Sequence, residues 1–208
     1  MKADEPRGPG GKPLRMQRPH RSKVPPGEVR LIGGRLKRSK LPVPDRPGLR
    51  PTPDRVRETL FNWLGQDLTG WRVLDAFAGS GALGFEAASR GAAAVLLLEQ
   101  DGTLVASLQA SAQRLGTAEL RVQRTDALRW MATAEPGSFE LVLLDPPFET
   151  DQLATAIAVA VPLVAPGGYL YVESPGLPGE PPAGLEPWRS LKAGAVHAQL
   201  WRRPEPMA

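Results

Sequence analysis

The sequence predicts a doubly wound α/β fold, in which helices cover both faces of a mostly parallel β-sheet. After Gly70, short apolar runs alternate with segments whose apolar residues recur every three or four positions. The short runs are continuously apolar, which is typical of strands buried on both faces. Hydrophobic residues make up 41% of the 208-residue chain, which is enough material for a packed core.

The alternation gives the order of the elements in the main body, residues 70–208. We expect strands at 72–76, 94–99, 120–124, 139–145 and 169–173, with helices at 81–90, 104–115 and 153–164. The segment 191–203 is expected to add two short strands around Gly194. Strands separated by helices pair in parallel, so this pattern predicts a single open sheet.

Two further segments precede this body. Residues 1–28 are rich in Lys, Arg, Pro and Gly, so they cannot bury enough apolar surface to offset the entropy of ordering. We therefore expect a flexible basic arm. Residues 29–69 are predicted to form a small basic β-ribbon/helix extension, in which Val29–Ile32 pairs with Leu36–Val43.

The helix of this extension carries the apolar stripe Val56, Leu60, Trp63 and Leu64. Thr52 is expected to be its N-cap and Pro53 its first residue.

Composition excludes several classes of protein. The chain has no cysteine and two histidines, so we expect no disulfide, no catalytic thiol and no metal site. Its longest apolar stretch, Leu153–Ala165, has 13 residues and is too short to span a bilayer. The basic N-terminus lacks the apolar segment of a signal peptide, so we expect a soluble cytoplasmic protein without membrane partners.

Charge is divided unequally along the chain. Residues 1–57 contain 16 Lys and Arg against 5 Asp and Glu, whereas residues 58–208 contain 10 against 17. A basic front on an acidic body is the arrangement expected of a protein that binds nucleic acid. The alternative interpretation is a solvated basic tail that has no specific ligand.

The first candidate site is the glycine-rich turn DAFAGSGALG, which follows the first strand of the body. Gly79, Gly81 and Gly84 satisfy G-x-G-x-x-G, so a dinucleotide site and an NAD-dependent oxidoreductase are alternatives. However, Asp75 precedes the glycines and would repel a pyrophosphate. Glu99, at the end of the second strand, can accept hydrogen bonds from ribose hydroxyls. S-adenosylmethionine, which carries an ammonium and a sulfonium but no phosphate, suits this pair of acids better.

The second candidate site is Asp145-Pro146-Pro147-Phe148, which ends the fourth strand. Two successive prolines lack N–H groups and fix φ, so the carbonyls of Asp145 and Pro146 are expected to be held outward as acceptors. With the Asp145 carboxylate, they can accept hydrogen bonds from an exocyclic amine while the base stacks on Phe148. Acceptors that orient the amine lone pair toward a methyl donor favour methyl transfer.

Together, DAFAGSG, Glu99 and DPPF resemble the class I S-adenosylmethionine-dependent methyltransferases that act on exocyclic amines. The stretch VRLIGGRLKRSKLPVPDRPGLRPTPDRVRETLFNWL more particularly resembles the start of the bacterial 16S rRNA guanine-N2 methyltransferases of the RsmD type. The likeness extends to about residue 203 and includes YVES and QLWRR. It implies a Rossmann-like methyltransferase sheet, the cofactor S-adenosyl-L-methionine, and 16S rRNA in the small ribosomal subunit or its precursor as partner.

The resemblance also assigns roles to individual residues. Six would contact the cofactor: Asp75, Phe77, Gly79, Gly81, Glu99 and Asp126. Four would hold the target guanine and direct the transfer: Asp145, Pro146, Pro147 and Phe148. Six are candidates for RNA contact: Arg30, Arg35, Arg50, Thr52, Arg55 and Arg57.

Three other functions remain open from the sequence. One keeps the chemistry and changes the substrate, as in an N6-adenine nucleic-acid methyltransferase or an enzyme acting on another exocyclic amine or amide. The second is the NAD-dependent oxidoreductase. The third is a non-catalytic RNA-binding module, which gives no reason for three acids, Asp75, Glu99 and Asp145, at strand ends. We expect a monomer, as the simplest state.

Overall fold

The computed structural model describes residues 27–46, 52–147, 152–176 and 179–206. Its helices are α1 (Asp54–Trp63), α2 (Ala82–Ser89), α3 (Gly102–Leu115), α4 (Ala127–Met131) and α5 (Gln152–Ala160). The main sheet contains β3 (Arg72–Asp75), β4 (Ala94–Glu99), β5 (Leu120–Arg124), β6 (Phe139–Leu144), β7 (Val164–Ser174), β8 (Glu186–Ala193) and β9 (Val196–Arg202).

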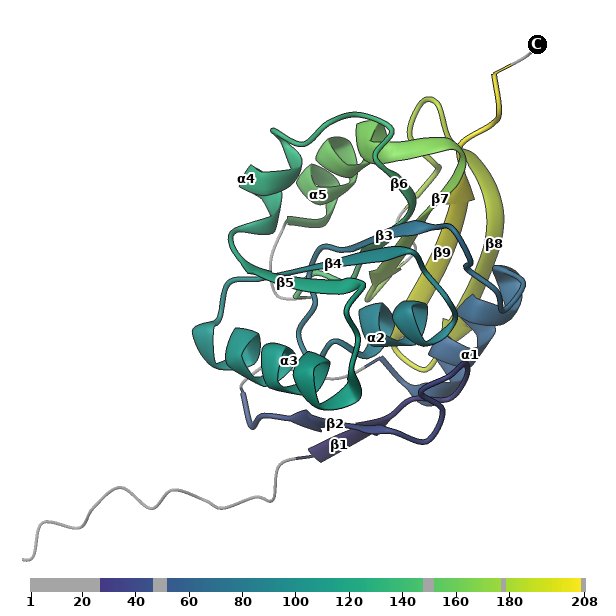
Figure 1. Ribbon diagram of the computed structural model, residues 1–208. Coiled ribbons are helices and arrows are strands. Elements are labelled where there is room, and N and C mark those ends of the chain that lie inside the picture. The colour runs from purple at the N-terminus through teal and green to yellow at the C-terminus, as the bar shows by residue number, and fades with distance from the viewer. Residues whose placement is uncertain (1–26, 47–51, 148–151, 177–178, 207–208) are drawn as a thin grey trace, which may run out of the picture.

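The strand order of this sheet is β5-β4-β3-β6-β7-β9-β8. The strands from β5 to β7 pair in parallel, and β9 is antiparallel to both β7 and β8. Helices α1, α2 and α3 lie along one face of the sheet, and α4 and α5 lie along the other (Figure 1). The predicted doubly wound α/β fold is therefore confirmed. The order reverses between β3 and β6, where open α/β sheets bind their ligands.

The largest differences from the prediction concern α5, α4 and the strands β7 and β8, each of which begins five residues earlier than expected. The helix expected over 153–164 ends at Ala160, because Pro162 cannot donate a helical hydrogen bond and clashes with the preceding turn. Val164, which we expected on that helix, begins β7 instead. Helix α4 was not predicted, because its five residues are too few to show a helical period. No helix in the described part of the chain has the length and apolarity needed to cross a membrane.

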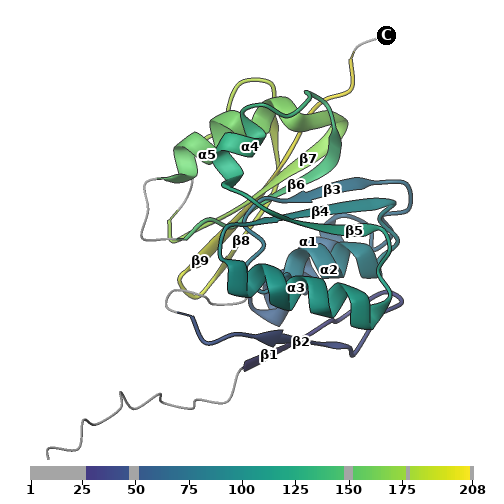
Figure 2. The ribbon, with the colours of Figure 1, turned by 60° about the vertical axis from the view of Figure 1, so that its left-hand side comes forward.

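The predicted ribbon is present as β1 (Gly27–Arg30) paired antiparallel with β2 (Lys40–Val43), over shorter ranges than expected. It runs along the side of α3 that faces away from the sheet in both views (Figures 1 and 2). The Arg114 guanidinium donates to the Lys40 carbonyl over 2.6 Å, and the Leu36 N–H donates to the Ser89 hydroxyl over 2.9 Å. These bonds tie the ribbon to α3 and α2.

Helix α1 buries Val56, Leu60 and Phe61 completely, and each such side chain contributes about 1.5–3 kcal/mol of hydrophobic stabilisation. The predicted N-cap is wrong by one residue. Pro53 occupies the cap, and its carbonyl accepts hydrogen bonds from the N–H groups of Val56 and Arg57. Thr52 lies one residue earlier, outside the helix.

A buried carboxylate, Glu86 of α2, joins the ribbon to the main body. Its oxygens accept the Ile32 and Gly33 backbone N–H groups over 3.0 and 2.8 Å. They also pair with the guanidinium groups of Arg57 and Arg90, over 3.5 and 2.8 Å. Glu86, Arg57 and Arg90 are all buried. A carboxylate removed from water in this way is stable only because each oxygen has several donors.

We predict that Glu86→Gln lowers the free energy of unfolding by about 3–5 kcal/mol, because two buried guanidinium groups lose their buried carboxylate partner and Arg57 retains only the exposed Asp54. Urea unfolding followed by circular dichroism measures this loss. The matched control is Glu28→Gln, which removes an exposed ion pair with Lys40 and should cost less than about 1 kcal/mol. Equal losses in the two variants would contradict the structural role of Glu86.

Candidate active site

Four carboxyl groups gather at one edge of the main sheet. Glu99 ends β4, Asp75 ends β3, Asp145 follows β6 directly, and Glu173 lies one residue before the end of β7. These four strands are neighbours in the sheet and run in parallel, so their carboxyl ends meet. Asp75 and Glu173 are each 2% exposed, whereas Glu99 and Asp145 are partly exposed.

Strand register places these four side chains on one face of the sheet. One row of paired residues crosses the strands: Leu97, Asp75, Leu143 and Tyr171. Glu99, Asp145 and Glu173 each lie two residues beyond this row. Because side chains alternate between faces, residues two apart share a face. Leu97, Leu143 and Tyr171 pack in the core beneath α1, α2 and α3, so the acids face the same side.

The glycine-rich segment forms the turn after β3 and the first residues of α2, and its N–H groups bind both acids of the first predicted pair. The Gly79 N–H donates to Oε2 of Glu99 over 3.0 Å, and the Gly84 N–H donates to Oδ2 of Asp75 over 3.0 Å. Gly81 precedes α2 at φ +78°, where a Cβ would lie 2.5 Å from the Leu108 side chain. Glycine is therefore required at this position by both conformation and space.

The chemistry of this edge favours a cationic ligand. None of the ion pairs among the described residues includes one of the four acids. Unneutralised carboxylates attract an ammonium or sulfonium and repel a pyrophosphate. These residues thus fit S-adenosylmethionine and argue against a dinucleotide. Glu99 already accepts two backbone N–H groups, from Gly79 and Asp101, which fixes its orientation and leaves lone pairs for hydroxyl donors.

Burial raises the pKa of three of these carboxyls. The pKa of Asp75 is about 7 because the group is desolvated, and the nearby charges of Asp145 and Glu99 also raise it. Desolvation likewise raises the pKa of Asp145 to about 7. The pKa of Glu173 rises to about 8 through desolvation and then through the charge of Asp145. The three groups therefore titrate near neutral pH, which is common at functional sites.

Of the four residues predicted to hold the target base, three are described. Asp145 receives a hydrogen bond from the Thr52 hydroxyl over 3.4 Å. Pro146 is buried and Pro147 is exposed. Phe148 lies outside the described residues.

The other two predicted cofactor residues lie around this edge. Phe77 is half-buried in the turn after β3 and packs against the core on the α4 and α5 side. Asp126 does not end β5 but follows it by two residues and caps α4, where its carboxylate accepts the Arg129 N–H over 2.9 Å. Its side chain is exposed to solvent.

The six candidates for RNA contact separate into three groups. Arg30, Arg35 and Arg55 are exposed on the N-terminal extension, and Arg35 pairs with Glu119. Arg50 lies outside the described residues. The assignment of Arg57 is wrong, because its fully buried guanidinium binds Glu86, Asp54 and two backbone carbonyls. Thr52 is also buried, and it faces Asp145 rather than a solvent-exposed surface.

Glu173 and Tyr171 were missed by the sequence analysis, which interpreted YVES as the end of a strand. The Tyr171 hydroxyl donates to Oε1 of Glu173 over 2.8 Å, and both side chains are buried. A sequence signal for Glu173 was available. It is a glutamate at the end of a continuously apolar strand, where both faces are expected to be buried and an ionised side chain is unusual.

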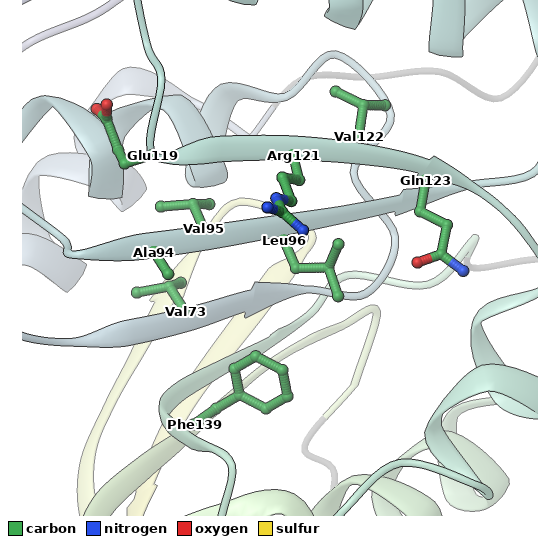
Figure 3. A pocket seen from close by; sticks show the side chains of 9 residues that line it. All are labelled: Val73, Ala94, Val95, Leu96, Glu119, Arg121, Val122, Gln123 and Phe139. Atoms are coloured by element: carbon green, nitrogen blue, oxygen red, sulfur yellow. The ribbon is translucent and has the colours of Figure 1, made fainter.

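Two concavities lie away from this edge. One, of about 420 Å³, is formed on the β3, β4 and β5 surface, where Leu96 and Gln123 project on the same side and face Phe139 (Figure 3). The other, of about 320 Å³, lies between α5 and Trp201. Neither is lined by any of the four acids.

We predict that the ligand-free protein loses stability as pH rises from 5.5 to 8.5. The folded-state pKa values of Asp75, Asp145 and Glu173 lie above their unfolded values, so their stability contribution is full only below the unfolded values, at about pH 4, and is lost progressively as pH rises to about 7 to 8. The thermal midpoint should fall by at least about 4 °C. Differential scanning calorimetry measures it, with Asp145→Asn as the comparison.

In Asp145→Asn the fall should be smaller, because one of the three titrating groups is removed. A midpoint that is constant or rises over this range would contradict the proposed titration of the buried acids.

Comparison with known proteins agrees with this architecture. Residues 29–202 match the family described as conserved hypothetical protein 95. Ribosomal RNA small subunit methyltransferase D of Escherichia coli K12 is 42% identical over 182 residues, which cover 85% of this chain and 91% of that protein. The protein of the same name from Haemophilus influenzae is 41% identical over 153 residues, covering 71% and 79%. A solved Escherichia coli structure assigned to the methyltransferases matches with a TM-score of 0.76 and 40% identity, covering 86% and 99%.

The matched range begins at the ribbon and ends with the last strand of the sheet, so it includes both the N-terminal extension and the acidic edge. The motifs on which the resemblance was based lie within it. The chain therefore belongs to the conserved hypothetical protein 95 family, which is the RsmD-type family that its motifs resemble.

Proposed function

We propose that this protein transfers a methyl group from S-adenosyl-L-methionine to the exocyclic N2 amine of a guanine in 16S rRNA. The observation that carries the proposal is the row of carboxyls without ion-pair partners among the described residues, which crosses the switch point of the sheet and includes Asp145 directly before Pro146. The names and the extent of the relatives support ribosomal RNA as the substrate. We propose that the enzyme acts in the cytoplasm as a monomer, on the small subunit or its precursor.

In this proposal, the glycine-rich turn and its two acids bind the cofactor. Glu99 accepts hydrogen bonds from ribose hydroxyls, and Asp75, fixed by the Gly84 N–H, attracts the ammonium group. Asp126 and Phe77 border the adenine. When bound, S-adenosylmethionine supplies an electrophilic methyl group on a sulfonium.

Asp145 has the central chemical role. An exocyclic amine on guanine is a poor nucleophile because its lone pair is delocalised into the ring. Asp145 and the Pro146 carbonyl accept the amine hydrogens and orient the lone pair toward the methyl group, while Phe148 stacks on the base. Thr52 donates to Asp145 and restrains its carboxylate. The target base must leave its stack to enter the site.

The exposed arginines of the N-terminal extension hold the RNA. Arg30, Arg35 and Arg55 supply positive charge, which the acidic edge lacks. Contacts to phosphate give an affinity that falls as the salt concentration rises, and they do not distinguish one base from another. Base selection is therefore assigned to the Asp145–Phe148 segment.

We predict that Asp145→Ala lowers kcat for methyl transfer by about 10²–10³-fold, because the amine loses its charged acceptor. The binding constant for S-adenosylhomocysteine should change less than about threefold. The assay follows tritium transfer to small subunits from a strain that lacks the enzyme, together with calorimetry of the cofactor product.

The control for this variant is Glu186→Gln, on the exposed edge strand β8, which should have wild-type kinetics. Full activity in Asp145→Ala would refute the assigned role. Identification of the tritiated nucleoside as N6-methyladenosine would instead support the adenine alternative.

We also predict that Arg55→Glu raises KM for the subunit without lowering kcat. The slope of the logarithm of the binding constant against the logarithm of salt concentration should fall by about 1 for each phosphate contact removed. Filter binding at several salt concentrations measures the slope. Arg189→Glu is the matched control, because Arg189 is an exposed arginine of the main sheet, on β8, and stacks on Trp188. Equal effects of the two substitutions would contradict a localised RNA surface.

A further inference from the structure

Glu173 is a buried acid to which the proposed mechanism gives no role. Its side chain is 2% exposed, and it lies on the longest strand of the sheet, β7. The Tyr171 hydroxyl donates to its Oε1 over 2.8 Å. No Lys or Arg pairs with it among the described residues. A carboxyl removed from water without a cation destabilises the fold when it ionises, so packing gives no reason for it.

The strand register sets Glu173 beside Asp145. Leu143 pairs with Tyr171 and Leu144 pairs with Val172, so the next residues along the two parallel strands are Asp145 and Glu173. Neighbouring strands lie about 4.8 Å apart, and both side chains point to the same face. Two carboxyl groups at this separation do not both ionise near neutral pH, so the pair retains one proton.

Other groups around Glu173 are also acidic or neutral. Asp145 faces it from β6 and Asp75 from β3, while Tyr171 lies on its own strand and Thr52 approaches from the segment before α1. The Thr52 hydroxyl is also 3.4 Å from Oδ2 of Asp145. No group in this set supplies a positive charge, so a proton is what can neutralise the pair.

We propose that Glu173 is a positioning residue that shares one proton with Asp145 and so leaves Asp145 as the single, oriented proton acceptor for the target amine. The inference deepens the proposed function and rests on it. As the methyl group moves, its C–S bond breaks, the electron pair stays on sulfur, and the amine lone pair forms the N–C bond. The nitrogen is then cationic, and it releases one N–H proton to Asp145. The pair now holds two protons and returns one to water when the product leaves.

The variant that tests this role is Glu173→Gln. Glutamine keeps the size of the side chain and an oxygen that accepts from Tyr171, but it cannot share or hold the proton. We expect kcat to fall about 10–100-fold, with KM for the subunit and the affinity for S-adenosylhomocysteine within twofold of wild type. The acidic limb of the kcat–pH profile should move to higher pH by about one unit, because the Asp145 carboxylate loses the neighbouring carboxyl whose shared proton stabilises its negative charge.

Tyr171→Phe is the matched control for packing. It removes the hydrogen bond to Glu173 but leaves both carboxyls, so the acidic limb should stay within about 0.3 units of its wild-type position. If Glu173 had only a structural role, the two variants would lose stability and activity without a shift in the pH profile.

A second measurement does not depend on activity. In the ligand-free protein with ¹³C-labelled glutamate side chains, one carboxyl resonance should titrate near pH 8 and should be missing from Glu173→Gln. Its absence from the wild-type spectrum would overturn the shared proton. Wild-type kcat with an unshifted pH profile in Glu173→Gln would overturn the positioning role.

These outcomes are separable from failure of the proposed function. If the wild-type protein methylates no guanine in the subunit, the proposed function fails, while the resonance still tests the shared proton. If the wild-type protein methylates guanine and Glu173→Gln does so equally well, only the inference about Glu173 fails.

Discussion

Electrostatic repulsion among carboxyl groups at one sheet edge is the constraint on which the rest of this structure depends. Parallel pairing forces the ends of β4, β3, β6 and β7 together, and register turns Glu99, Asp75, Asp145 and Glu173 to one face. Such a cluster is unfavourable for folding when ionised, first because burial desolvates its members and then because Asp75 and Glu173 are repelled by neighbouring carboxylates, and the raised pKa values express that cost. A cationic ligand relieves the same repulsion, so the instability of the empty edge favours cofactor binding.

Helix α2 links this edge to the N-terminal extension. Its Gly84 N–H holds Asp75, and two residues later Glu86 holds the backbone of Ile32 and Gly33. Two positions of one short helix, Gly84 and Glu86, thus fix Asp75 and the ribbon relative to each other. The buried guanidinium of Arg57 completes the connection from α1. Two arginines of α1 therefore differ in environment, because Arg57 is buried and holds the extension in place while Arg55 is exposed.

Much of the fold and part of the site follow from sequence alone. The bounds of β4 and β5 agree with the prediction, because apolar runs bounded by polar residues and glycine are local signals. The acids Asp75, Glu99 and Asp145 were identified because each follows an apolar run directly. The role of Arg57 was not predictable, since its position beside an apolar stripe is compatible with either a solvated side chain or a buried ion pair. Only the packing of α1 on α2 distinguishes the two.

By itself, the sequence determined the alternation of strands and helices, the family, and the acids at three strand ends. These are local properties, because a strand end or a glycine turn depends on residues within a few positions of it. Tertiary structure decided that Glu173 lies beside Asp145 and that Thr52 faces the site instead of capping a helix. Glu173 is 28 positions from Asp145 in the sequence, and Thr52 is 93 positions from it. Strand register brings the first pair together and helix docking the second, and neither has a local sequence signature.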